Sequence, residues 1–181
     1  MSFRYELRLS GSGGQGLILA GKILAEAAAI YDGKNATQSQ SYGPEARGGS
    51  SRSEVIISDE EIDYPKAVNI DLLLCFTQEA CDKYYKDVKE NGVLLVDSGY
   101  VSKKPEGKFK VYSLPITEIA EKEVGKALVA NIVALGIITE YTGIVSREAV
   151  ESAILSRVPK GTEEINLKAF RIGLEKGRTL K

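Results

Sequence analysis

Apolar residues fall into short runs in the first two thirds of the chain and into longer periodic stretches near its end. Tyr5, Leu7 and Leu9 alternate with polar residues, which is the two-residue period of a half-buried strand. Continuous apolar runs, such as residues 72–76, are typical of strands buried on both faces. These patterns predict strands over residues 4–9, 35–40, 54–58, 71–76, 93–97 and 109–114.

Helical spacing of apolar residues predicts helices over residues 13–30, 79–90, 117–124, 127–141, 146–158 and 163–176. Gly33 and the pair Asn91-Gly92 are expected to end the first two helices, and Ser146 to cap the fifth. Strands that alternate with helices predict an α/β fold. We expect a Rossmann-like, doubly wound, mainly parallel sheet with a helical C-terminal part, formed by residues 1–181 as a single domain.

A glycine-rich turn separates the first strand from the first helix. Three of its glycines have the G-x-G-x-x-G spacing, which lets a phosphate approach the backbone beside a helix N-terminus. The S-x-x-Q pattern of Ser12 and Gln15 is that of a capping box and predicts that the helix begins at Ser12. The turn is therefore a candidate anion site made of Gly11, Ser12, Gly13, Gly14, Gln15 and Gly16.

The same turn raises the alternative of a stand-alone NAD(P)-dependent Rossmann oxidoreductase. Such proteins place an acidic residue about 20 positions on, at the end of the second strand, to bind the ribose. Asp32 has about the right count, but it lies in the turn before the predicted second strand. The number of residues between the turn and Asp32 favours a nicotinamide nucleotide, whereas the position of Asp32 before the second strand argues against one.

Residues 37–53 form a polar strip with Tyr42 as their only large ring and no large aliphatic residue. Arg47 and Arg52 lie among serines, glutamines and glycines, and arginine side chains match phosphates and carboxylates. In a doubly wound fold the loop after the second strand lies beside the glycine turn. The strip is thus either part of a ligand site or subunit interface, or a solvated surface loop.

Composition narrows the possible functions. The 24 basic and 25 acidic residues give a net charge of −1, which offers no electrostatic support for binding nucleic acid. The sequence has no histidine, so it lacks an imidazole base or a histidine-based zinc site, and its two cysteines cannot supply the four thiolates of an iron–sulfur cluster. Cys75 and Cys81 are expected to be buried small apolar residues.

No apolar run approaches the length of a membrane helix and no signal-peptide pattern is present, so a cytoplasmic protein is expected.

Several segments together resemble the gamma subunit of the 2-oxoacid:ferredoxin oxidoreductases, which act on pyruvate, 2-oxoisovalerate, 2-oxoglutarate or indolepyruvate. The resemblance is carried by GSGGQGLILAGKILAEAA, QSQSYGPEARGGSSRSEVIIS, the buried strands at residues 71–74 and 93–97, and later segments at residues 131–136, 158–159 and 166–170. It covers essentially the whole chain and leaves the identity of the 2-oxo acid open.

The resemblance implies a subunit of an enzyme that decarboxylates a 2-oxo acid, passes electrons to ferredoxin and transfers the acyl group to coenzyme A. It implies that alpha and beta subunits hold thiamin diphosphate with Mg²⁺, that delta-type subunits or fused domains hold iron–sulfur clusters, and that this chain holds no catalytic residue and no metal. It also implies that the chain helps to bind coenzyme A and completes the complex.

For coenzyme A, we expect the glycine turn and Arg47 to contact phosphate. The expected interface or ligand residues are Tyr42, Glu45, Gly48, Gly49 and Arg52. Glu45 could instead pair with Arg47 inside the loop, and Asn131 is expected to be a polar anchor rather than a catalyst. A non-catalytic scaffold subunit is a third alternative, and the isolated chain can be expected to form a homodimer through the surface that it normally gives its partners.

Overall fold

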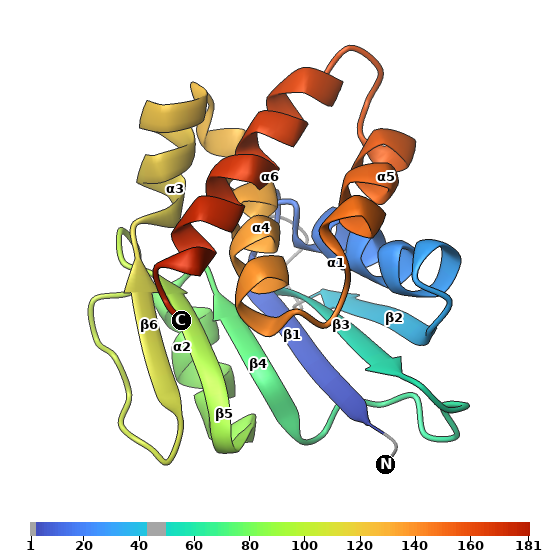
Figure 1. The fold of residues 1–181 in the computed structure, drawn as a ribbon. Coiled ribbons are helices and arrows are strands. Elements are labelled where there is room, and N and C mark those ends of the chain that lie inside the picture. Colours follow the sequence, from blue (N-terminus) through green and yellow to red (C-terminus); the bar gives the residue numbers. More distant parts are fainter. Residues whose placement is uncertain (1–2, 43–49) are drawn as a thin grey trace.

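The computed structural model describes residues 3–42 and 50–181, which form a six-stranded sheet with helices on both faces (Figure 1). The strands are β1 (Arg4–Ser12), β2 (Asn35–Tyr42), β3 (Ser50–Ser58), β4 (Ile70–Cys75), β5 (Val88–Asp97) and β6 (Lys110–Leu114). The α-helices are α1 (Leu17–Glu26), α2 (Gln78–Tyr84), α3 (Ile116–Ile119), α4 (Ala130–Thr142), α5 (Arg147–Arg157) and α6 (Glu163–Arg178). Short 3-10 or π segments are η1 (Ala27–Tyr31), η2 (Tyr85–Asp87), η3 (Ala120–Val124) and η4 (Ala127–Val129).

The strand order is β2-β3-β1-β4-β5-β6. Strands β1, β4, β5 and β6 pair in parallel, while β3 pairs antiparallel with both β1 and β2. Because β3 is reversed and β2 is reversed again, β2 runs in the same direction as β1. The prediction of an α/β fold with a mainly parallel sheet is confirmed, although β2 and β3 form a hairpin rather than a crossover unit.

Two apolar cores lie on the two faces of the sheet. Helices α1, α3, α4, α5 and α6 cover one face of the sheet and α2 covers the other (Figure 1). Leu7 and Leu9 of β1 belong to the core on the first face, while Arg8 between them lies against Tyr84 of α2 on the second. Helix α4 is buried on nearly all sides because it lies between the sheet and α6. In the part of the chain that the structure describes, no helix is long and apolar enough to span a bilayer.

Glycines bring α4 and α6 unusually close together. A Cβ atom built on Gly173 would overlap the carbonyl oxygen of Val133, and one built on Gly136 would overlap that of Phe170. A Cβ built on Gly177 would lie 2.7 Å from the carbonyl oxygen of Ile137. The two backbones therefore pack directly against each other, without a layer of side chains between them.

The structure corrects three sequence predictions. The first helix does not begin at Ser12, because Ser12 still pairs with Ser50 as the last residue of β1. Most of the polar strip is not a loop, since β2 extends to Tyr42 and β3 already begins at Ser50. The helix predicted over residues 79–90 ends in η2, and Asn91-Gly92 lies within β5, where Asn91 takes a positive φ of 67°.

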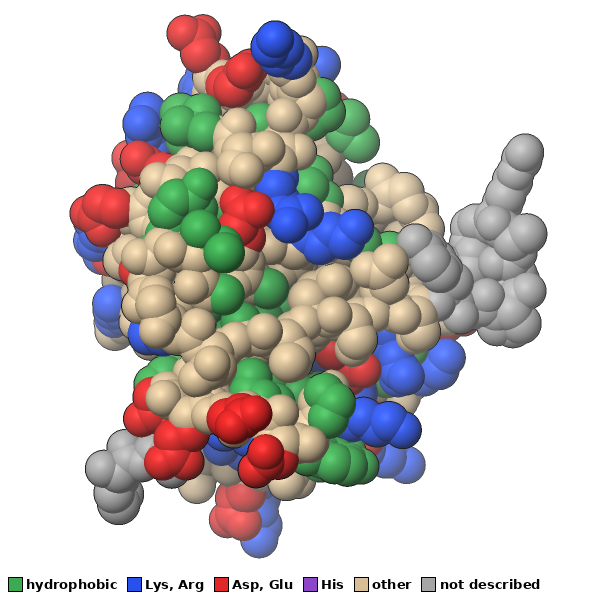
Figure 2. Space-filling view, turned by 90° about the vertical axis from the view of Figure 1, so that its right-hand side faces the viewer, with side chains coloured by type: hydrophobic (Ala, Val, Ile, Leu, Met, Phe, Trp, Pro, Cys, Tyr) green, Lys and Arg blue, Asp and Glu red, His purple; other side chains and the backbone are tan. Residues whose placement is uncertain are grey.

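The hairpin places β2 at one edge of the sheet, and this strand contains no charged residue. Figure 2 faces the side of the molecule at which β2 lies, and the middle of this side is mostly tan, the colour of backbone and of uncharged polar side chains. The polarity of residues 37–42 is thus the polarity of an edge strand, whose side chains need not face a core.

Candidate functional site

The glycine turn lies at the carboxyl end of β1, between Ser12 and the start of α1 at Leu17. Gly14 and Gly16 have φ angles of 86° and 73°, in the left-handed region where side chains are strained. Gly11 is also constrained, because a Cβ at this position would overlap the side-chain oxygen of Gln15. The G-x-G-x-x-G spacing therefore corresponds to a sharp turn at the edge of the sheet where ligands of open α/β folds bind.

The capping box forms only in part. The backbone N–H of Ser12 donates to Oε1 of Gln15 at 2.7 Å, as a capping box requires, but the residue that precedes the helix is Gly16 and not Ser12. The first bond into the helix runs from the N–H of Ala20 to the carbonyl of Gly16 at 3.1 Å. Within the described residues, the amides of residues 17–19 have no hydrogen-bond partner, so α1 presents its unpaired donors at this turn.

Asn131 fixes the turn to helix α4. Its Nδ2 donates to the carbonyl of Gly16 at 2.9 Å, and its Oδ1 accepts from the N–H of Ile132 at 2.9 Å. The side chain is buried, and a Cβ on Gly16 would overlap its amide nitrogen. The interpretation of Asn131 as a polar anchor is confirmed.

A cleft of about 280 Å³ opens beside the turn, along the carboxyl edge of the sheet. Its lining comes from the turn, from the segments that follow β4 and β5, from η4, and from the starts of α3 and α4. The lining residues are Gly14, Gln15, Phe76, Tyr100, Thr117, Ala127, Leu128 and Ala130. None of them carries a charge.

Asp97, the last residue of β5, is fully buried and organises the far side of the cleft. Its Oδ2 accepts from the N–H of Thr117 at 3.0 Å and from the Thr117 hydroxyl at 2.5 Å, while Oδ1 accepts from the N–H of Gly99 at 3.1 Å. This carboxylate thus joins the turn after β5 to the start of α3. Its contacts are structural, and the sequence offered only its position at the end of a buried strand as a signal.

The polar strip meets the glycine turn, as the sequence predicted. Ser50 pairs with Ser12, and Ser51 lies between Gly11 on one side and Tyr42 on the other. Arg52 does not line the cleft, because its Nε donates to the Ser41 hydroxyl at 2.8 Å on the face of the sheet that α2 covers. The remaining predicted residues, Glu45, Arg47, Gly48 and Gly49, lie outside the described residues.

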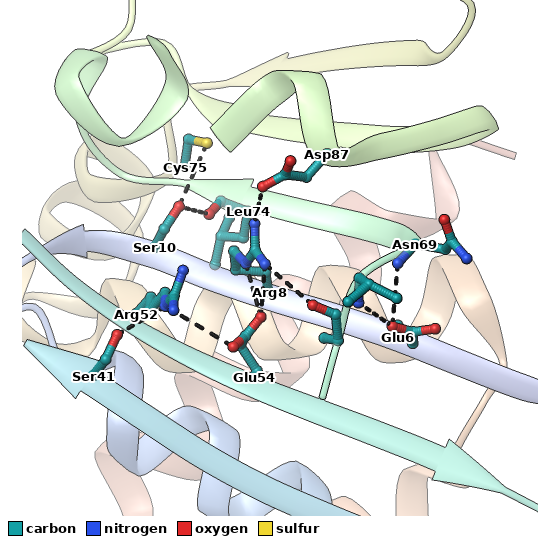
Figure 3. Close-up of polar contacts among 12 residues, drawn as sticks. Glu6, Arg8, Ser10, Ser41, Arg52, Glu54, Asn69, Leu74, Cys75 and Asp87 are labelled. Atoms are coloured by element: carbon teal, nitrogen blue, oxygen red, sulfur yellow. Dashed lines mark hydrogen bonds and ion pairs between the residues drawn. The ribbon is translucent and has the colours of Figure 1, made fainter. Parts of the chain in front are cut away.

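Sequence reasoning missed a buried ionic cluster on the α2 face (Figure 3). Arg8, only 4% exposed, donates to Oε2 of Glu54 through Nε and Nη2 at 2.9 and 2.8 Å, and through Nη1 to Asp87 at 2.5 Å. Its guanidinium also lies 4.9 Å from the centre of the Tyr84 ring. Burial opposes the charge, but the bonds to Glu54 and Asp87 outweigh it and raise the pKa of Arg8. The alternation of apolar and polar residues in β1 would be the same whether its polar face met solvent or another helix. Only the position of α2 shows that this polar face is covered.

Two further residues have structural roles. The carboxylate of Asp32 accepts from the N–H and the hydroxyl of Ser146, both at 2.7 Å, and so holds the start of α5 instead of lying free near the turn to bind a ribose. Cys75 and Cys81 are both buried, as predicted, and burial raises the pKa of the Cys75 thiol. In residues 3–42 and 50–181, no group of three or more potential ligands is placed to hold a metal ion.

Comparison with known proteins gives consistent matches. The sequence model of the family described as pyruvate ferredoxin/flavodoxin oxidoreductase matches residues 6–176. The chain is 57% identical over 182 residues to 2-oxoglutarate synthase subunit KorC of Methanocaldococcus jannaschii, covering 99% of this chain and 97% of that protein.

Two solved structures share the fold. The gamma subunit of a keto/oxoacid ferredoxin oxidoreductase from Geobacter sulfurreducens has a TM-score of 0.87 and 59% identity, covering 97% of this chain and 99% of that one. The 2-oxoglutarate:ferredoxin oxidoreductase of Magnetococcus marinus, solved with 2-oxoglutarate, coenzyme A and succinyl-CoA, has a TM-score of 0.86. At 22% identity, over 98% of this chain and 32% of that one, this second match shows the fold alone.

Proposed function

The chain belongs to the pyruvate ferredoxin/flavodoxin oxidoreductase family as the gamma subunit of a 2-oxoacid:ferredoxin oxidoreductase, and we propose that its glycine turn binds the phosphates of coenzyme A. One observation carries the proposal: the amides of residues 17–19, which have no partner among residues 3–42 and 50–181, lie at a turn that Asn131 fixes beside an uncharged cleft. Backbone N–H groups at a helix N-terminus are well suited to phosphate.

The proposed role of each residue follows from its place in the turn. Gly11, Gly13 and Gly14 would let the phosphate approach the backbone, and Ser12 and Gln15 would keep the turn in shape through the hydrogen bond that the Ser12 N–H donates to the Gln15 side chain. Gly16 would direct the first turn of α1 at the phosphate. Arg47, which follows the end of β2 in the sequence, would add a guanidinium contact. Tyr42, Glu45, Gly48, Gly49 and Arg52 would serve the ligand or a partner subunit.

We place the chemistry of the enzyme on other subunits. The family uses coenzyme A, and the chain's own part would be to bind and orient that co-substrate. Thiamin diphosphate with Mg²⁺ would be held by alpha and beta subunits, and iron–sulfur clusters by a delta-type subunit that passes electrons to ferredoxin. A homodimer of the isolated chain would use the surface that these partners cover.

We further propose 2-oxoglutarate as the 2-oxo acid of the complex. The support is the 57% identity to a 2-oxoglutarate synthase subunit over nearly the full length of both proteins. In the assembled enzyme, kcat/KM for 2-oxoglutarate should then exceed that for pyruvate, and the opposite ranking would refute this choice.

Titration calorimetry tests whether coenzyme A is the ligand. Adding coenzyme A to the chain, alone or in its complex, should give a heat of binding, whereas adding NADH should not. Gly16→Ala should abolish this binding, because its Cβ overlaps Asn131 at the turn. Gly33→Ala is the matched control, since Gly33 has a similar φ of 65° and open space around its Cβ position. Absence of any coenzyme A binding by the assembled complex would overturn the proposal.

A further inference from the structure

Strand β2 is an edge of the sheet that lacks the features that usually protect such an edge. It is eight residues long, contains no proline and no charged residue, and pairs with β3 in an unbroken register from Asn35 to Tyr42. Among residues 3–42 and 50–181, no strand pairs with its outer side. An edge of this kind presents a row of N–H and C=O groups with which another strand can pair.

The opposite edge of the sheet, β6, is protected. It is only five residues long, it begins with the exposed Lys110, and Pro115 follows it directly. A short strand, a lysine and a proline all discourage pairing with another chain. The contrast between the two edges indicates that β2 is the one left open for a partner.

The amide side chains of β2 lie on the α1 face of the sheet. Gln38 donates through Nε2 to the hydroxyl of Ser53 at 3.1 Å, and Ser53 lies against Gly21 of α1. Gln40, two residues further along the strand, lies on the same face.

The hydroxyl side chains of β2 lie on the other face, which α2 covers in part. The Ser41 hydroxyl accepts from Nε of Arg52 on this face, so Thr37 and Ser39 also lie there. Reading outward from Ser39 in either direction therefore gives first an amide on one face and then a hydroxyl on the other.

We propose that a second copy of this chain docks at β2, by antiparallel pairing of the two β2 strands about a twofold axis through Ser39. Directly opposite side chains in such a pair lie on the same face of the sheet. The axis places Gln38 opposite Gln40 of the second copy, and Thr37 opposite Ser41. Amide thus meets amide and hydroxyl meets hydroxyl, so the strand is complementary to itself.

The side-chain chemistry supports this register. Hydroxyl pairs and glutamine ladders across strands form hydrogen bonds. Gln40 accepts from Gln38 of its own strand at 3.0 Å, and within the described part of the chain its amide nitrogen has no partner, so it can donate to the second copy. Because β2 has no charge, the pairing brings no like charges together.

Exposed apolar side chains flank the same edge. Ile30 is 70% exposed and Tyr31 is 46% exposed, and both belong to η1, which immediately precedes β2 and packs against it. Figure 2 faces this side of the molecule. Their cover by the second copy would add apolar burial to the backbone pairing.

The inference rests on the homodimer in the proposed function and names its surface, but it does not depend on the coenzyme A site. A charge swap in the isolated full-length chain tests it. Ser39→Lys and Ser39→Glu each place like charges opposite each other at the axis, and each should raise the Kd of the dimer at least tenfold, measured by sedimentation velocity. An equimolar mixture of the two variants should restore the dimer, which a misfolded variant could not do. Ser102→Lys, at an exposed serine after β5, is the control and should leave the Kd unchanged.

Cross-linking tests the register. Opposite residues of antiparallel strands have Cα atoms about 4.5–5.5 Å apart, which a disulfide can span. Under mild oxidation Ser39→Cys should therefore link to itself, and Gln38→Cys should link to Gln40→Cys in a mixture more readily than either variant links to itself. The native Cys75 and Cys81 are buried, and Ser102→Cys should not link.

The outcomes separate this inference from the proposed function. A wild-type chain that stays monomeric at high concentration would overturn both the homodimer and the β2 interface. A dimer that survives Ser39→Lys and gives no Ser39→Cys link would keep the homodimer and refute β2 as its surface. Neither test uses coenzyme A, so failure of the chain's complex to bind coenzyme A would overturn the proposed ligand and leave the β2 interface standing.

Discussion

At the scale of single residues, Asn131 joins the two segments that build the site. Its side-chain nitrogen bonds from α4 directly to the glycine turn, while its side-chain oxygen accepts from the N–H of Ile132 in α4. We expect Asn131→Ala to lower the free energy of unfolding by about 1–3 kcal/mol, because a buried hydrogen bond is lost. Affinity for coenzyme A, measured by calorimetry, should fall with it because the turn is no longer held.

Asn166 provides a matched control for this change. It is also a buried asparagine, and its Nδ2 donates at 2.9 Å to the carbonyl of Thr162, the residue that precedes α6. Asn166→Ala should cost similar stability and leave coenzyme A affinity unchanged. Equal losses of affinity in both variants would mean that Asn131 acts only through stability.

The residues of the turn were predictable from the sequence, but their exact roles were not. Glycine spacing identified the turn because glycine readily takes the positive φ angles of Gly14 and Gly16. The Ser12–Gln15 pattern misplaced the helix start because strand pairing with Ser50 holds Ser12 in β1. A local hydrogen-bond pattern cannot reveal a partner strand that lies 38 residues away in the chain.

At the scale of elements, the close approach of α4 and α6 depends on glycine. Gly173→Ala should lower the free energy of unfolding by about 1–3 kcal/mol, because the added methyl group overlaps the Val133 carbonyl and forces the helices apart. Chemical denaturation measures this effect. Glu175→Ala, on the exposed side of the same helix, should change stability little, and a stable Gly173→Ala variant would contradict the packing described here.

Glu140 ties three helices together by charge. It lies near the end of α4, accepts two bonds from Arg147 of α5 at 2.8 Å, and lies 3.5 Å from Arg178 of α6. Burial opposes its charge, but the bonds from Arg147, with Lys181 and Arg178 nearby, prevail and lower the pKa of Glu140.

The lowered pKa of Glu140 predicts that the free energy of unfolding depends on pH in the acid range. The charged carboxylate contributes stability above the unfolded pKa of about 4.3, and this contribution is lost as the pH falls through the lower folded pKa. Glu140→Gln should therefore be less stable at pH 7, and its unfolding midpoint should fall less steeply below about pH 4. Glu118→Gln, which removes an exposed pair with Lys122, should keep the wild-type acid profile.

Element boundaries show where sequence patterns lose information. Asn91-Gly92 has the composition of a helix stop, yet it lies within β5, where Asn91 takes the positive φ that asparagine tolerates. Helix α6 was predicted almost to the residue, because its buried positions 166, 169, 170, 173, 174 and 177 follow the helical period closely.

At the scale of the whole molecule, composition and alternation indicated the α/β class and the mainly parallel sheet. They did not indicate that β3 runs opposite to its neighbours, because a strand's direction in a sheet leaves no trace in its own pattern. The hairpin nonetheless brings the strip to the glycine turn, through the pairing of Ser50 with Ser12.

Substitution of Arg47 tests whether the polar strip contributes to ligand binding or to association of the subunits. In the assembled enzyme we expect Arg47→Ala to raise the KM for coenzyme A roughly tenfold or more, as for a lost charge-assisted hydrogen bond, with the subunits still associated on size-exclusion chromatography. Arg171→Ala, which removes an exposed pair between α6 and α5, should change neither quantity. Weakened assembly with an unchanged KM would instead assign Arg47 to a scaffold role.

The glycine contact between α4 and α6 also bears on the entropy of binding. Helix α4 cannot slide or rotate without driving its backbone into that of α6, because no deformable side chains separate the two. Asn131 transmits this rigidity to the turn, so the amides at the start of α1 are ordered before a ligand arrives. On the proposed function, a phosphate bound at the turn would therefore lose little of its interaction energy to ordering the protein, and we expect the glycines of α6 to affect its affinity without contacting it.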